Sequence, residues 1–289
     1  MRIIFIWWFA VLPIFIFSQP LPTTNLYSLV LQSDKNFVIE NVEFLNSFNF
    51  KSYNNQPYFI NDDEIVCTIK TNTSSSTDIY RLNLKDKTYT NLISNSGNDY
   101  SPRLHPEIKN GITCVHVPEN DTTQYLVVYN EHPYENYTTL LQNPGQVGYY
   151  RFYKEKIWVC FLVDQPYNLL AIIGPDSKKI FASEIGRTFE VVNEQIYFVH
   201  KILKDEWILK SYDVESEKMN RIANMPAGSE DFVILDNGDI LCSAGGTILK
   251  LNKSRDVWEL VFDLSGFGLN HIGRFSIRTN RLVLVNEIK

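Results

Sequence analysis

Seven polar residues lie in or near a loop phrase that recurs along the chain, in which a glycine is closely followed by an aromatic residue, as in Gly186 and Phe189. Carboxylate, guanidinium and imidazole groups supply hydrogen bonds and ion pairs, which is the chemistry of ligand recognition. One interpretation is that the aromatic residues begin strands and pack between sheets. The other is that their polar neighbours line a binding rim, with the candidates Asp99, Arg103, Arg151, Glu230, Asp231, His271 and Arg274.

Motifs for catalysis and for metal binding are missing from the chain. It contains no His-Glu-x-x-His, Cys-x-x-Cys or EF-hand loop, and no Gly-x-Ser-x-Gly nucleophile motif. The glycine-rich stretch 266–273 lacks the spacing of a dinucleotide-binding loop. His116 and His200 each lie two residues after an equivalent strand position, which favours a packing role. We therefore expect no catalytic residue, no metal site and no cofactor.

The elements that must position the seven residues are short apolar strands that repeat. One position marks each repeat, at residues 67, 114, 160, 198, 242 and 284, which gives intervals of 47, 46, 38, 44 and 42 residues. Such a period, built from short strands, is typical of a β-propeller with one four-stranded sheet per repeat. The predicted fold class is all-β, a six-bladed β-propeller. The compact third repeat leaves five or seven blades open.

The first and last repeats are incomplete in a complementary way, if the strands of each repeat are named a to d in chain order. The last repeat has an a strand near 272–277 and a b strand at 282–286. Near the N-terminus, 26–31 resembles a c strand and 37–45 follows as a d strand. We expect these segments to pair in one mixed blade that closes the ring. Residues 19–289 would then form a single propeller domain.

The N-terminus has the features of a secretory signal peptide. Arg2 precedes the apolar run 3–17, and Ser18 is a small residue suited to a cleavage site. The run is short for a transmembrane helix, and an uncleaved anchor is the alternative. We expect residues 1–18 to be removed, which predicts a periplasmic or secreted protein with no transmembrane span.

The four cysteines occupy the same position in four different repeats, at Cys67, Cys114, Cys160 and Cys242. Packed sheets lie about 10 Å apart, whereas a disulfide needs Cα atoms within about 7 Å. We therefore expect buried free thiols although the protein is exported. The formal net charge of −6 and the absence of a basic run argue against nucleic acid as a partner.

The second repeat resembles the repeat of TolB-like propellers. The phrase Asp-Tyr-Ser-Pro-Arg-Leu-His-Pro at 99–106 precedes the apolar strand 112–115, and 78–84 is similar to the third strand of that repeat. The Gly-His and Trp-Asp motifs of WD40 repeats are absent, so the protein is WD40-like only in its repeat architecture. The resemblance implies an exported bacterial propeller. It does not imply a role, because propellers of one fold differ in function.

The function expected from these observations is a binding or scaffolding module. Its rim loops would hold a protein or peptide partner, or a glycan, and we expect a monomer. The alternative is a lactonase-like propeller hydrolase or lyase, with a metal at the central channel held by residues such as Glu190, Asp231 and Asn270. A structural or adhesive surface protein is a third possibility.

Overall fold

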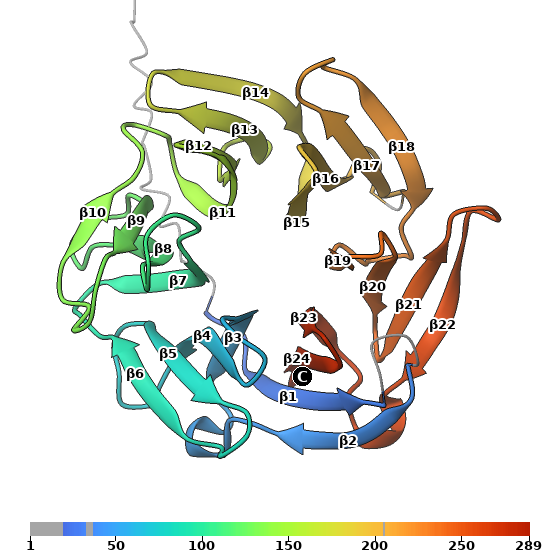
Figure 1. Cartoon of the computed structure of the whole chain (residues 1–289), viewed down its shortest axis with the longest axis horizontal. Helices are drawn as coiled ribbons and strands as arrows, with labels where there is room; N and C mark the ends of the chain where they lie inside the picture. Colours follow the sequence, from blue (N-terminus) through green and yellow to red (C-terminus); the bar gives the residue numbers. More distant parts are fainter. Residues whose placement is uncertain (1–19, 33–36, 205) are drawn as a thin grey trace, which may run out of the picture.

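The computed structural model describes residues 20–32, 37–204 and 206–289, so the signal peptide predicted at 1–18 lies outside the described residues. Within these ranges the chain forms six four-stranded antiparallel sheets arranged in a ring, which confirms the predicted six-bladed propeller (Figure 1). None of the helices in the described residues is long and apolar enough to cross a membrane. The two that occur there are single 3-10 turns, η1 (Ser47–Asn49) and η2 (Ser265–Phe267).

Five blades are each made from four consecutive strands, with strand a innermost and strand d outermost. Blades 1 and 2 contain β3 (Tyr53–Phe59), β4 (Glu64–Lys70), β5 (Asp78–Asn83), β6 (Tyr89–Ile93), β7 (Asn98–Leu104), β8 (Ile112–Val117), β9 (Tyr125–Tyr129) and β10 (Tyr137–Thr139). Blades 3 and 4 contain β11 (Val147–Lys154), β12 (Ile157–Leu162), β13 (Leu169–Gly174), β14 (Ser177–Ser183), β15 (Ile185–Val192), β16 (Gln195–His200), β17 (Ile208–Asp213) and β18 (Met219–Asn224). Blade 5 contains β19 (Phe232–Ile234), β20 (Ile240–Ala244), β21 (Thr247–Asn252) and β22 (Val257–Asp263).

Blade 6 joins the two ends of the described chain. Its strand order is β2-β1-β24-β23, with bounds β2 (Ile39–Phe44), β1 (Thr24–Leu31), β24 (Arg281–Glu287) and β23 (Ile272–Arg278). The pairing of β1 with β24 is antiparallel and runs from Thr24 opposite Glu287 to Val30 opposite Arg281. Figure 1 shows the blue β1 beside the red β24. The mixed blade expected from the phase of the repeats is therefore present.

The core lies between blades, in six apolar layers that each join two neighbouring sheets. One layer, for example, packs Leu26 and Val283 of blade 6 against Ile65 of blade 1. Strands b are covered on both faces and are buried almost throughout, as in β4 and β24. This explains why they read as unbroken apolar runs, whereas outer strands such as β18 are mostly exposed and polar.

The marked position of each repeat lies in these layers, and the four cysteines there are free thiols buried from solvent. Burial raises the pKa of Cys67, Cys114, Cys160 and Cys242.

We expect Ellman's reagent to label no thiol in the native protein and all four after unfolding in urea. The unfolded thiol ionises near pH 8.5, below the pKa of the folded state. The thiols' contribution to stability is therefore complete below about pH 8.5 and is lost as the pH rises further. Labelling of the native protein at neutral pH would contradict this packing.

Candidate functional site

The centre of the ring contains a cavity of about 670 Å³. Its walls come from the innermost strand of every blade, namely β3, β7, β11, β15, β19 and β23. The lining also includes the turns that follow β19 and β23, at 235–237 and at Thr279. The cavity therefore extends from the starts of the inner strands to the hairpins that join strands a and b. Its volume lies in the range of pockets that hold small ligands.

One ring of the lining is set by strand register. In each blade a lining residue pairs with the strand-b residue just before the marked position. The six residues are Tyr58, Arg103, Arg151, Glu190, Val233 and Ser276. In blades 1 and 2 the register shifts just before this ring, and Gln56 and Ser101 at the shift have positive φ angles of 57° and 56°. Such bulges re-aim the side chains that follow them.

Arg151 and Glu190 form a two-point ion pair between neighbouring blades. The Nε and Nη2 atoms of Arg151 donate to the Glu190 carboxylate at 3.0 and 2.8 Å. Burial by itself would raise the pKa of Glu190, but the Arg151 guanidinium, with a smaller contribution from Arg103, outweighs burial and the pKa is lowered. Glu190 is therefore an anion that forms an ion pair with Arg151.

Arg103 lies in the same ring without such a partner. Its guanidinium stacks over the Tyr58 ring, 4.7 Å from the ring centre. Burial, together with the like charge of Arg151, lowers the pKa of Arg103 to about 10. The positive charge of Arg103 is thus held beside a second arginine. Glu190 attracts it as well, but Arg103 forms no ion pair with a carboxylate among the described residues.

A second group of side chains lies nearer the starts of the inner strands and is centred on Arg187. Its guanidinium pairs with Asp231, which also accepts a hydrogen bond from the Thr188 hydroxyl at 2.6 Å, and Arg187 donates to the Gly273 carbonyl at 2.7 Å. Arg187 therefore links blades 4, 5 and 6. The Glu230 carboxylate forms ion pairs with Arg187 Nε at 3.5 Å and with Lys201 Nζ at 2.6 Å, and Glu230 is not part of the cavity lining.

Arg274 reaches across the ring from blade 6 to blade 3. Its Nη2 atom donates to the Tyr149 hydroxyl at 2.6 Å, and its guanidinium lies 4.8 Å from the centre of the Tyr149 ring. Two blades lie between blade 3 and blade 6 in either direction around the ring, so this contact spans the channel. It narrows the cavity near the starts of the inner strands.

The structure brings four of the seven candidate residues together in the cavity lining, namely Arg103, Arg151, Asp231 and Arg274. The other three, Asp99, Glu230 and His271, are not among the lining residues. His271 is exposed in the loop before β23. Sequence reasoning about the loops did not select Arg187, Tyr58 or Ser276. The strand-b repeat was the signal that could have identified Tyr58 and Ser276. Both pair with the strand-b residue just before the marked position, as Arg103 and Arg151 do.

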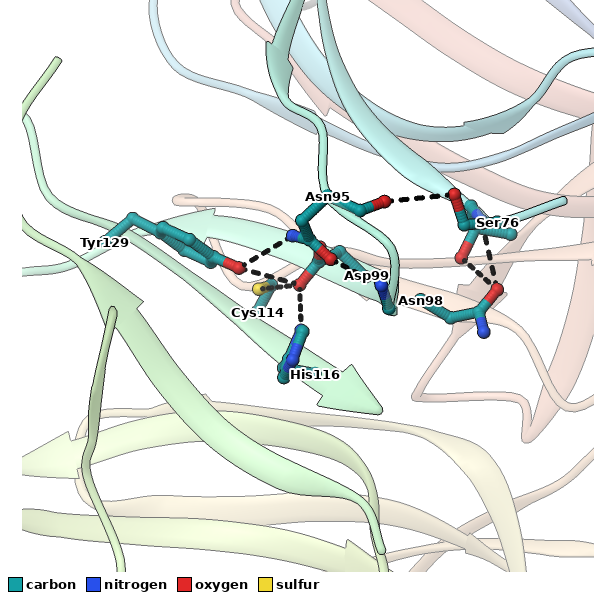
Figure 2. Close-up of polar contacts among 9 residues, drawn as sticks. Ser76, Asn95, Asn98, Asp99, Cys114, His116 and Tyr129 are labelled. Carbon is teal, nitrogen blue, oxygen red and sulfur yellow. Dashed lines mark hydrogen bonds and ion pairs between the residues drawn. The ribbon is translucent and has the colours of Figure 1, made fainter. Parts of the chain in front are cut away.

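Asp99 is fully buried at the start of β7 and is the centre of a polar cluster inside blade 2 (Figure 2). Its Oδ1 atom lies 3.0 Å from His116 Nδ1 and accepts from the Cys114 thiol at 3.2 Å and from the Tyr129 hydroxyl at 3.4 Å. The Asn95 amide donates to Oδ2 at 2.8 Å. All four donor groups come from blade 2 or the loop before it, which gives Asp99 the surroundings of a structural anchor.

The carboxylates considered for a metal site are engaged with arginines. Glu190 pairs with Arg151 and Asp231 pairs with Arg187, while Asn270 is exposed and is not among the residues that line the cavity. In the described part of the chain, no group of three or more His, Cys, Asp or Glu side chains is arranged to hold a metal ion.

Comparisons with known proteins support the fold. No family model and no curated protein matches the chain. Among solved structures, it is similar to a candidate TolB from Agrobacterium tumefaciens, with a TM-score of 0.64 at 8% identity over 93% of this chain and 99% of that one. TolB from Acinetobacter baumannii gives 0.57 at 13% identity over 91% and 64%. Oligogalacturonate lyase from Vibrio parahaemolyticus gives 0.51 at 8% identity over 91% and 97%. The resemblance to TolB-like propellers is thus confirmed for the fold.

Proposed function

We propose that the protein is an exported, monomeric binding module whose central cavity receives a segment of a protein partner. The observation that carries this proposal is the cavity itself, because polar side chains from all six blades line one space of about 670 Å³. Rigid strands hold these side chains, as binding sites on propellers and similar scaffolds require. The fold is similar to that of TolB proteins, and the alignment with one of them covers 93% of this chain and 99% of that chain. This likeness is compatible with such a role.

The proposed opening lies at the hairpins that follow β19 and β23, where 235–237 and Thr279 line the cavity. The rim expected from sequence is at the other end of the inner strands. The contact between Arg274 and Tyr149 narrows the cavity near that end, which favours approach from the hairpin side. We assign the protein to the periplasm or the extracellular space on the basis of the signal peptide expected at residues 1–18.

Photo-crosslinking in the producing cells tests the proposal. A photoreactive amino acid at Ser276, in the cavity wall, is expected to form a covalent adduct with a partner peptide that mass spectrometry can identify. The matched control carries the same amino acid at Leu260, which is 62% exposed on the outer strand β22. Adducts at Leu260 but not at Ser276 would move the binding site to the outside of the ring, and adducts at neither position would refute the proposal.

The enzymatic alternative, a propeller hydrolase or lyase, is less well supported by the site. A metal-dependent mechanism would need free carboxylates in the channel, whereas Glu190 and Asp231 are each held by an arginine. The likeness to oligogalacturonate lyase is one of fold alone. We therefore place binding ahead of catalysis.

A further inference from the structure

The cavity carries an excess of positive charge in an acidic protein. Five arginines and three carboxylates line it, an excess of two positive charges, whereas the whole chain has a formal net charge of −6. The lining contains neither lysine nor histidine. Guanidinium groups present planar, two-point donors that match a carboxylate, and they keep their charge at any physiological pH. The composition of the wall therefore suits a negatively charged ligand.

The arginines of the lining differ in what they contact. Arg151, Arg187 and Arg278 each form an ion pair, with Glu190, Asp231 and Asp62 respectively. Arg103 and Arg274 form no ion pair among the described residues. Arg103 contacts the face of Tyr58, and Arg274 contacts the ring and the hydroxyl of Tyr149. An arginine has five N–H donors, so both guanidinium groups keep donors that a ligand can use.

The aromatic rings of the site point to the same ligand chemistry. Arg103 lies over the face of Tyr58, and Arg274 lies over the face of Tyr149. Each of these rings therefore has one face occupied by a guanidinium group, and this contact fixes the group in place. The N–H edge of the guanidinium group still has donors for an anion. The pKa of Arg103 is lowered to about 10 by burial and by Arg151. Glu190 offsets part of this effect, and a bound anion would relieve the remainder.

We propose that Arg103 and Arg274 bind carboxylate groups of an acidic peptide segment that enters the cavity. The proposal rests on the proposed function, since it names the chemistry of the segment that the cavity receives. The two arginines come from different blades and contact tyrosines of two further blades. Arg274 lies two residues before Ser276, which is the blade 6 member of the ring that contains Arg103, so the two arginines also start at different depths of the cavity. Two carboxylates spaced along one flexible chain therefore fit this arrangement better than one compact anion does.

Two capped tripeptides that differ only in charge test the proposal by isothermal titration calorimetry. Acetyl-Glu-Glu-Glu-amide is expected to bind at least tenfold more tightly than acetyl-Gln-Gln-Gln-amide, because only the former offers charge-assisted hydrogen bonds to arginine. Arg103→Gln and Arg274→Gln are each expected to weaken binding of the acidic peptide about tenfold, and the double variant should lose it. Affinity should also fall as salt is added.

The matched control is Arg221→Gln. Arg221 is exposed on β18, pairs with Asp256 and does not line the cavity, so this variant should bind the acidic peptide as the unaltered protein does. Thermal melting checks that the cavity variants fold. Equal binding of the acidic and neutral peptides, or unchanged binding by both Arg103→Gln and Arg274→Gln, would overturn the proposal.

Two further measurements distinguish a peptide from a small anion as the ligand, and separate the carboxylate assignment from the proposed function. Inorganic phosphate or citrate that binds more tightly than the acidic peptide would overturn the assignment to a peptide. A crosslink at Ser276 to a partner segment without acidic residues would overturn the carboxylate assignment but leave the proposed function standing. Binding of the acidic peptide without any crosslink at Ser276 in cells would leave the anion site standing and refute the proposed function.

Discussion

Replacing Asp99 by alanine is expected to lower the free energy of unfolding by about 3 kcal/mol or more, because several buried hydrogen-bond donors lose their shared acceptor. Asp99 is fully buried, and its carboxylate is the common acceptor for His116, Asn95, Tyr129 and the Cys114 thiol (Figure 2). The alanine variant leaves His116, Cys114 and Tyr129 buried without this acceptor, and each unsatisfied group costs about 1–3 kcal/mol. The Asn95 amide keeps the Tyr129 hydroxyl as a second acceptor. Urea denaturation monitored by tyrosine and tryptophan fluorescence measures the loss.

Two variants make this experiment specific to the cluster in blade 2. Asp99→Asn keeps one acceptor oxygen and should destabilise the protein less than Asp99→Ala does. Asp176→Ala removes an exposed carboxylate in the turn between β13 and β14, and its effect should stay within about 0.5 kcal/mol. If Asp99→Ala cost no more than Asp176→Ala, the cluster would have no role in stability.

Replacing Leu284 by alanine is expected to lower the free energy of unfolding by about 2–5 kcal/mol, as large-to-small changes in a packed core do. Leu284 is fully buried at the marked position of β24, and its apolar layer joins Leu29 of β1 to Leu241 and Ile248 of blade 5. The cavity left by the change would therefore weaken both the closing blade and its contact with blade 5. Urea denaturation gives the magnitude of this effect.

Hydrogen exchange locates the same effect. Because the closing blade joins two ends of the chain, amide protection in β1 and β24 should fall more than protection in β12, which lies on the other side of the ring (Figure 1). Leu260→Ala, on the exposed outer strand β22, should change stability by less than about 0.5 kcal/mol. Uniform loss of protection around the ring would show that closure has no separate stability.

The strands that could be predicted from sequence are those whose burial leaves a simple pattern. Strands b are covered on both faces and appear as apolar runs, and the c and d strands near the N-terminus complete the blade that β23 and β24 begin. The third repeat was harder to parse because its connections are short. Only residues 155–156 separate β11 from β12, and only Glu184 separates β14 from β15.

The candidate site was harder to predict because it depends on contacts between blades. Asp99 and Arg103 are four residues apart, which in a regular strand would place them on the same face. The register shift at Ser101 and Pro102 instead pairs Asp99 with His116 and Arg103 with Thr113, which lie on opposite faces of the sheet. Asp99 therefore enters the cluster in blade 2, while Arg103 enters the cavity. Nothing local in the sequence reveals that shift, apart from the proline.

The way the ring closes also determines how it would respond to a pull. The chain enters β1 at Thr24 and leaves β24 at Glu287, and these two residues face each other at one end of the pair. The backbone hydrogen bond from Ile288 to the Thr23 carbonyl lies just beyond them. A pulling force applied between residues 23 and 288 would separate the two strands one residue pair after another. It would not shear all of their hydrogen bonds at once. Against force of that direction, the blade that completes the circle is the one that yields first.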